Sequence, residues 1–204
     1  MHRRGFLLGL PFLLAACGAE EEWAPADVIA AKAYQHPGPP RLTLITMKNT
    51  GSHNGAHTAL MINASQRVLW DPAGTFRADS IPERNDVLFG ITPVVERFYI
   101  SYHSRITYYT VIQELDVSPE VAEQALQTVM AYGAVPKANC TRATSQILAS
   151  LPGFGHIKTS FFPNNLSDQF GKIPGVRTRE YRETDADDNS QAAVQINTAL
   201  NEAQ

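Results

Sequence analysis

Alternation of apolar and polar residues predicts four β-strands along the middle of the chain. The segments 41–47, 57–62 and 66–71 are short, rich in β-branched and large apolar residues, and bounded by turn-forming residues. Residues 106–115 have the same character. The short polar segment 63–65 predicts that the second and third strands form a β-hairpin.

Helical spacing of apolar residues predicts helices in the second half of the chain. Ser118 followed by Pro119 is a typical helix start, and the apolar spacing continues to Gly133. A second helix is predicted from about 140 to 151, and a third, short helix after the turn at 161–166.

The order of these elements favours an α+β fold, in which an antiparallel sheet is packed by helices on one side. Residues 74–100 are harder to assign, and within them the segment 81–86 is expected to begin a short helix or to remain a loop. From Thr184 the chain is acidic and then polar, which predicts a flexible tail over 184–204.

The N-terminus has the pattern of an export signal. A basic head precedes the apolar run 6–16, which is too short to span a bilayer as a helix. The run ends in Leu14-Ala15-Ala16-Cys17, which resembles the lipobox of bacterial lipoproteins. The resemblance implies a signal peptide at 1–16 and acyl chains, palmitate among them, on Cys17 as the new N-terminus.

Two further features of this region bear on export. The sequence Arg3-Arg4-Gly5-Phe6-Leu7 resembles a twin-arginine motif, although an ordinary basic head contains the same arginines. Gly18 is not the aspartate linked to inner-membrane retention, so the resemblance implies the periplasmic side of the outer membrane. The predicted organisation is a lipid-anchored tether at 17–40, a domain at 41–183 and the tail.

Charge narrows the set of partners. The chain has 17 Lys and Arg against 20 Asp and Glu, and its formal charge of −3 becomes −5 when Arg3 and Arg4 leave with the signal peptide. Nothing basic is left for nucleic acid, so no nucleic-acid partner is expected. The predicted partner is the membrane, through the lipid, and no cofactor is predicted.

Cys140 is the leading candidate for chemistry. The only other cysteine is Cys17, so acylation of Cys17 leaves Cys140 without an intramolecular disulfide partner. An unpaired thiol is unusual in the oxidising periplasm, which favours a functional role. Cys140 opens a helix-competent run, and the field at a helix N-terminus lowers a cysteine pKa. A lone cysteine is most often an apolar filler, but the polar neighbours Asn139 and Thr141 do not suit one.

His57 is the leading candidate for a base beside this thiol. If residues 63–65 form a three-residue turn, Ile62 pairs with Gln66, and His57 then lies opposite Asp71. Cross-strand neighbours have β-carbons about 5 Å apart. Asp71 would then hold one ring nitrogen of His57 and leave the other for the thiol proton. A one-residue change in turn length would move Asp71 to the other face.

His57 and Asp71 also fit simpler structural roles. Asp71 precedes a proline and is a good turn former, and a histidine at a strand end is commonly a surface residue. A metal site formed by His53, His57 and Asp71 is an alternative. The four-residue spacing of the two histidines binds zinc well on a helix, but residues 54–56 argue against a helix here. No metal is predicted. His53 and His103 also compete with Asp71 as the third residue of a Cys–His site.

Three motifs stand out along the chain: Gly51-Ser-His-Asn-Gly-Ala-His-Thr-Ala-Leu-Met-Ile, Leu69-Trp-Asp-Pro-Ala-Gly and Asn139-Cys140. Together they resemble the circularly permuted papain-like hydrolases, relatives of the NlpC-type cell-wall peptidases and of lecithin–retinol acyltransferase. In the permuted group the histidine strand precedes the asparagine–cysteine helix, as it does here within about 41–151. The resemblance implies Cys140 as the nucleophile, His57 as the base and Asp71 as the residue that orients it.

The resemblance also implies a function. It predicts a cysteine peptidase, amidase or acyltransferase that acts on an amide, peptide or acyl-ester bond. The substrate would be a peptidoglycan peptide or a lipid. The alternative is a non-catalytic lipoprotein that uses the same fold as a binding or structural module. The loops around His53 and Phe161 are expected to select the substrate.

Overall fold

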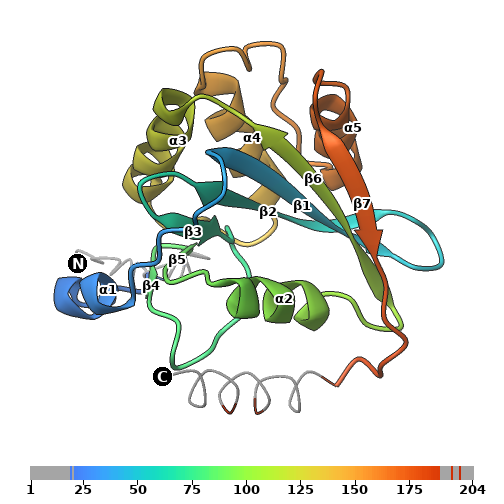
Figure 1. Cartoon of the computed structure of the whole chain (residues 1–204). Helices are drawn as coiled ribbons and strands as arrows, with labels where there is room; N and C mark the ends of the chain where they lie inside the picture. The colour runs from blue at the N-terminus through green and yellow to red at the C-terminus, as the bar shows by residue number, and fades with distance from the viewer. Residues whose placement is uncertain (1–18, 20, 189–193, 195–197, 199–204) are drawn as a thin grey trace, which may run out of the picture.

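A seven-stranded antiparallel sheet forms the centre of the protein (Figure 1). This computed structural model describes residues 19, 21–188, 194 and 198, so the predicted signal peptide 1–16 and Cys17 lie outside the described residues. The strands are β1 (Arg41–Asn49), β2 (Gly55–Asn63), β3 (Arg67–Trp70), β4 (Glu83–Arg84), β5 (Val87–Leu88), β6 (Tyr108–Asp116) and β7 (Arg177–Tyr181). Their order in the sheet is β4-β5-β3-β2-β1-β6-β7.

Helices cover both faces of this sheet. They are α1 (Ala26–Lys32), α2 (Pro93–Tyr102), α3 (Pro119–Tyr132), α4 (Cys140–Ser150) and α5 (Pro163–Gly171). Figure 1 shows α3, α4 and α5 on one side of the sheet and α2 on the other. The predicted α+β fold with an antiparallel sheet packed by helices is confirmed. The prediction that the helices lie on one side was wrong.

Two hydrophobic clusters explain why both faces need helices. Below α3, α4 and α5, one cluster joins alternate strand residues to helix residues such as Leu126, Ile147 and Leu166. On the α2 side, the other cluster joins the intervening strand residues, such as Ile45 and Met61, to the helix. Residues 42–47 of β1 are consequently all buried, because both of their faces are covered.

The β2–β3 hairpin has a register two residues away from the predicted one. Ile62 pairs with Val68, not with Gln66, so His57 does not lie directly opposite Asp71. A shift of two residues, unlike a shift of one, keeps every side chain on its expected face. Asp71 therefore stays on the face of His57 and reaches it diagonally.

The start of α3 agrees with the prediction from the sequence, whereas the segment 81–86 differs from it. Ser118 Oγ accepts a hydrogen bond from the Val121 N–H at 3.4 Å, as expected for a cap before Pro119. The segment 81–86 forms neither a helix nor only a loop, because it contains β4, which pairs with β5. Helix α2 begins at Pro93, within the stretch that the sequence left unassigned.

Segments that precede and follow the predicted domain 41–183 in the sequence contact that domain. Trp23 forms a β-bridge with Arg84, and the Ala24 N–H donates to the Glu83 carbonyl at 2.9 Å. At the other end, the Asp185 carbonyl accepts from the Ile106 N–H at 2.9 Å. Parts of the predicted tether and of the predicted tail are therefore held by hydrogen bonds to the domain.

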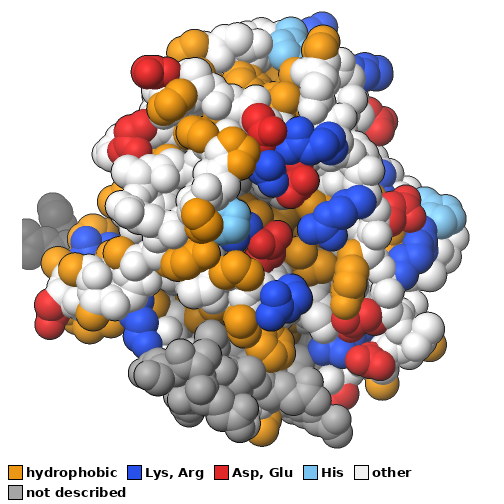
Figure 2. Space-filling model, in the orientation of Figure 1, with side chains coloured by type: hydrophobic (Ala, Val, Ile, Leu, Met, Phe, Trp, Pro, Cys, Tyr) orange, Lys and Arg blue, Asp and Glu red, His pale blue; other side chains and the backbone are white. Residues whose placement is uncertain are grey.

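The surface carries charges of both signs. On the face shown in Figure 2, Lys and Arg side chains are interspersed with Asp and Glu. Ion pairs join charged side chains across β1, β6 and β7, as between Arg41 and Asp116 at 2.6 Å. None of the helices in the described part of the chain is long and apolar enough to cross a bilayer.

Candidate active site

The three residues singled out as a Cys–His–Asp set come together at one end of the sheet. The His57 Nε2–H donates to Asp71 Oδ1 at 2.6 Å. His57 also interacts with Cys140, because each of the two groups shifts the pKa of the other. Because Asp71 holds Nε2, Nδ1 is the ring nitrogen that is left for the thiol.

The local fold explains how a residue from α4 reaches a strand residue. Strand β3 pairs with β2 only from Leu60 to Asn63, so the edge of β2 beside His57 is left to the N-terminus of α4. The Thr58 hydroxyl hydrogen-bonds the Thr141 hydroxyl at 3.1 Å, which fixes the first turn of α4 against β2. Cys140 is only 8% exposed at this junction.

Electrostatics favour the charged form of both Cys140 and His57. Burial alone raises the pKa of Cys140, but the hydrogen bond and positive charge of His57, with smaller effects of Thr141 and Thr58, lower that pKa below its ordinary value. Burial alone lowers the pKa of His57, but the charge and hydrogen bond of Asp71, together with Cys140, raise it to about 10. Both shifts favour a thiolate–imidazolium pair over the neutral thiol and imidazole.

Asp71 is held by Tyr99, which the sequence did not single out, and it occupies space left by Gly74. The Tyr99 hydroxyl, on α2, donates to Asp71 Oδ1 at 2.7 Å, so this oxygen accepts from both Tyr99 and His57. A β-carbon at Gly74 would lie 2.0 Å from Asp71 Oδ2, so only glycine leaves room for the carboxylate. A sequence signal for α2 existed, because Thr92 before Pro93 is a typical helix cap.

The pKa of Asp71 reflects these contacts. Burial alone raises the pKa of the carboxyl group. The positive charge and hydrogen bond of His57 outweigh burial, and His103 and Tyr99 add to their effect. The pKa of Asp71 is therefore lowered, and the carboxylate stays charged beside the imidazolium.

His103 and His53, the alternatives to Asp71, make different contacts. The His103 ring stacks on His57 with centroids 6.1 Å apart, and its Nδ1–H donates to the Tyr99 carbonyl at 2.8 Å. Burial, together with the charge of His57, lowers the pKa of His103 to about 4, so this ring is neutral. His53 Nδ1 is hydrogen-bonded to the Tyr109 hydroxyl at 3.2 Å instead.

The alternative metal set is not assembled. Within the described ranges, no group of three or more His, Cys, Asp and Glu side chains is arranged to hold a metal ion. His53, which that set requires, lies on a loop whose carbonyl accepts from the Asn164 Nδ2–H at 3.0 Å. The two loops expected to select the substrate, around His53 and Phe161, therefore lie close to each other.

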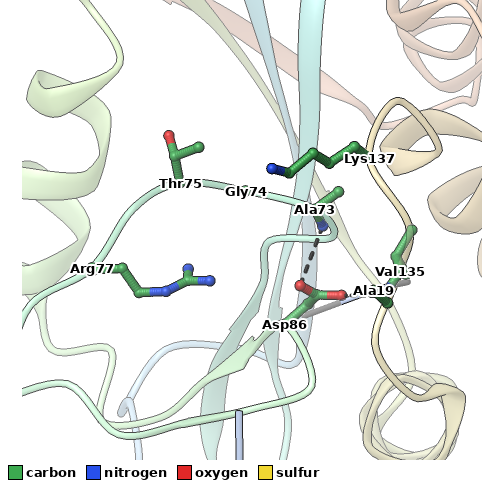
Figure 3. Close-up of a pocket in the computed structure, with 8 residues that line it drawn as sticks. All are labelled: Ala19, Ala73, Gly74, Thr75, Arg77, Asp86, Val135 and Lys137. Carbon is green, nitrogen blue, oxygen red and sulfur yellow. Dashed lines mark hydrogen bonds between the residues drawn. The ribbon is translucent and has the colours of Figure 1, made fainter. Parts of the chain in front are cut away.

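Two cavities flank the candidate site. The first, which we call the histidine cavity, has a volume of about 320 Å³ and is lined by His57 and His103 among others. The second, the cationic cavity, has a volume of about 230 Å³ and is lined by Arg77, Asp86 and Lys137 among others (Figure 3). Both sizes suit a small molecule or one portion of a larger one.

Comparisons of the chain with protein-family models, with curated proteins and with solved structures found no match.

Proposed function

We propose that the protein is a cysteine hydrolase or acyltransferase with a circularly permuted papain-like fold. The observation that carries the proposal is the series Cys140–His57–Asp71, in which His57 is hydrogen-bonded to Asp71 and interacts with Cys140, with the thiol at the first residue of a helix. The order of the elements supports the fold, because the histidine strand β2 precedes the cysteine helix α4 and the two pack together.

The contacts support a covalent mechanism. The Cys140 thiolate attacks the carbonyl carbon of an amide or ester, and a C–S bond forms while the oxygen becomes an oxyanion. The amide at the start of α4 helps to hold this oxyanion, since the first N–H groups of a helix have no partner within the helix. The His57 imidazolium then gives its proton to the leaving amine or alcohol. Water or another acceptor resolves the acyl thioester.

Asp71 has an electrostatic role in this mechanism. It holds the His57 ring in one orientation through Nε2 and stabilises the positive charge that the ring carries while the thiolate is present. Tyr99 keeps Asp71 in place by donating to the same oxygen. Tyr99 is a positioning residue, since its hydroxyl acts through Asp71.

The location is part of the proposal. The lipobox-like sequence before Cys17 supports acylation of that cysteine and attachment to the periplasmic side of the outer membrane. A peptidoglycan peptide and a membrane lipid are both within reach of a domain anchored there. The alternative is a non-catalytic lipoprotein that uses the fold as a binding module.

Labelling of the thiol by an electrophile tests the proposal. Fluorescent iodoacetamide is expected to modify the folded wild-type protein near neutral pH, and Cys140→Ala is expected to abolish the labelling. His57→Ala is expected to slow it by about 10² to 10⁴, because burial without the imidazolium raises the pKa of the thiol. The control His156→Ala alters an exposed histidine and is expected to label like the wild type. An inert thiol in the folded protein would support the non-catalytic module instead.

A further inference from the structure

Asp86 is a buried carboxylate that the proposed mechanism does not use. It is the second residue of the two-residue turn between β4 and β5, whose other residue is Asn85. Asn85 and Asp86 have φ of 45° and 67°. Positive φ at both central residues is typical of a type I′ turn, in which glycine is preferred at the second position because it has no β-carbon. An aspartate at this position therefore strains the backbone, which indicates a role for its side chain.

The carboxylate of Asp86 accepts one backbone amide on each oxygen. Oδ1 accepts the Ala73 N–H at 3.2 Å, and Oδ2 accepts the Val135 N–H at 2.7 Å. All three residues line the cationic cavity, and in Figure 3 the carboxylate points toward Ala73 and toward the loop that contains Val135. The Asp86 carbonyl also accepts the Asp71 N–H, at 2.8 Å. One residue of the β4–β5 turn thus holds two other loops by hydrogen bonds.

These two loops lead to the two ends of the candidate active site. Ala73 belongs to the turn 71–74, in which the Gly74 N–H donates to the Asp71 carbonyl at 2.9 Å. Val135 lies in the loop 133–139, which joins α3 to the nucleophile candidate at the start of α4. The Asp86 carboxylate is therefore a direct hydrogen-bonded connection between the turn of the orienting residue and the loop that leads to the thiol.

A charged carboxylate is unfavourable at this position apart from the contacts that it makes. Burial raises the pKa of Asp86, and the charge of Asp71 acts in the same direction. Hydrogen bonds from Val135 and Ala73, and the charge of Arg77, lower this pKa, but the net effect of all these groups is a raised pKa. The backbone of the turn alone would favour glycine or asparagine, which carry no charge. The two hydrogen bonds to the loops are therefore what the aspartate adds.

We propose that Asp86 is a positioning residue for the candidate active site. Its carboxylate fixes the turn 71–74 relative to the loop 133–139, and thereby the geometry in which His57 and Cys140 interact. It acts through the backbone amides of these two loops. This inference rests on the proposed function and adds a residue to the machinery of that site.

The pH profile of Cys140 labelling tests this inference. Without the Asp86 carboxylate, the alignment of the imidazolium with the thiolate loosens, and the pKa of the thiol rises because burial is opposed less strongly. We expect Asp86→Ala to slow iodoacetamide labelling near neutral pH about 10- to 100-fold and to move the midpoint of the profile upward by about one pH unit. The control Gln113→Ala also removes a buried side chain with two hydrogen bonds, here between β6 and α5, and is expected to keep the wild-type midpoint.

Two further variants separate the side chain of Asp86 from its turn. Asp86→Gly supplies the residue that a type I′ turn prefers and removes the carboxylate, and we expect it to shift the profile as Asp86→Ala does. Asp86→Asn keeps one acceptor oxygen and the size of the side chain, and we expect an intermediate shift.

Two outcomes overturn the inference. The first is an Asp86→Gly protein, shown by urea unfolding to be folded, that labels with the wild-type rate and midpoint, because Asp86 would then serve only the turn. The second is an equal shift in Gln113→Ala, because the effect would then follow from lost stability. Neither outcome affects the proposed function, which labelling of the wild-type thiol decides separately.

Discussion

The two faces of the sheet contribute different parts of the candidate site. The face under α3, α4 and α5 supplies the nucleophile candidate, Cys140, at the start of α4. The face under α2 supplies Tyr99 and His103, which surround the His57–Asp71 pair. Strand β2 joins the two, because His57 lies on the α2 face and the next residue, Thr58, contacts α4.

This difference separates the reactive group from the groups that orient it. The reactivity of the Cys140 thiol depends on its place at a helix start and on one histidine, and both features could be identified from the sequence. The orientation of that histidine depends on a buried carboxylate, which is itself held by α2 from the other side. Substitutions on the α2 face should therefore change reactivity without touching the thiol.

The largest effect is expected from Asp71→Asn, which breaks the connection between the two faces. An amide cannot balance the imidazolium charge, so the pKa of His57 falls toward its ordinary value and the thiolate loses its partner. We expect the rate of Cys140 labelling, and any esterase or amidase activity, to fall by about 10² to 10⁴. The exposed Asp168→Asn is the matched control. Labelling of Asp71→Asn at the wild-type rate would contradict the role given to Asp71.

A smaller loss is expected from Gly74→Ala, which leaves every reactive group in place. The new methyl group would lie 2.0 Å from Asp71 Oδ2, so the carboxylate must leave the position in which it accepts from His57 and Tyr99. Misplacement of this size is expected to slow labelling about 10- to 100-fold. The control Gly155→Ala places a methyl group where nothing lies within 4 Å. Similar rates for the two alanine variants would show that the position of Asp71 does not limit the reaction.

Tyr99→Phe sharpens the comparison by removing one hydrogen bond on the α2 face. Asp71 Oδ1 keeps His57 and loses the Tyr99 hydroxyl, a hydrogen bond to a charged group worth about 1.5–3 kcal/mol. We expect labelling to slow about tenfold and its pH profile to shift. Tyr132→Phe removes a hydroxyl from α3 on the opposite face, where it donates to Gln146, and is expected to change neither. A tyrosine effect confined to stability, with an unchanged pH profile, would reduce Tyr99 to a packing role.

The smallest effect expected is on the pH dependence of stability, where the stacked histidines act in opposite directions. The pKa of His57 rises from an ordinary 6.5 to about 10, so its contribution is complete below pH 6.5 and is lost as the pH rises toward 10. The pKa of His103 falls to about 4, so stability is lost as the pH falls from 6.5 toward 4. Urea unfolding at several pH values is expected to show a maximum near neutrality.

One variant tests the loss of stability on the acid side of this maximum. His103→Phe removes the group that must take up a proton on unfolding, and it should flatten the loss of stability between pH 6.5 and 4. The exposed His156→Ala is expected to leave the curve unchanged. An acid limb of equal slope in His103→Phe would assign the loss to the carboxylates.

The sequence predicted the elements whose signals are local. Alternation identified β1, β2, β3 and β6, and the cap at Ser118 and the apolar spacing identified α3. The thiol, its histidine and the carboxylate were identified from residue type and position, and the structure brings all three together. The roles assigned to them stay a prediction that the labelling experiments test.

Non-local contacts decided what the sequence did not predict. The register of the β2–β3 hairpin is fixed by contacts with the preceding segment, where Asn63 Nδ2–H donates to the Pro39 carbonyl and the Arg67 N–H to the Tyr34 carbonyl. Helix α2 is short and lies between irregular segments, and the partners of its buried residues come from strands distant in sequence. Tyr99 therefore had no sequence signal that connected it with Asp71.

The edges of the sheet bear on how the protein behaves when it is crowded. An open edge strand offers unpaired backbone groups, to which a strand of another molecule can add. β7, at one edge, carries the exposed charged residues Arg177, Arg179 and Glu180. β4, at the other edge, is only two residues long and is bridged by Trp23. Both edges therefore disfavour aggregation by strand addition. This property matters most where the local concentration of the protein is high.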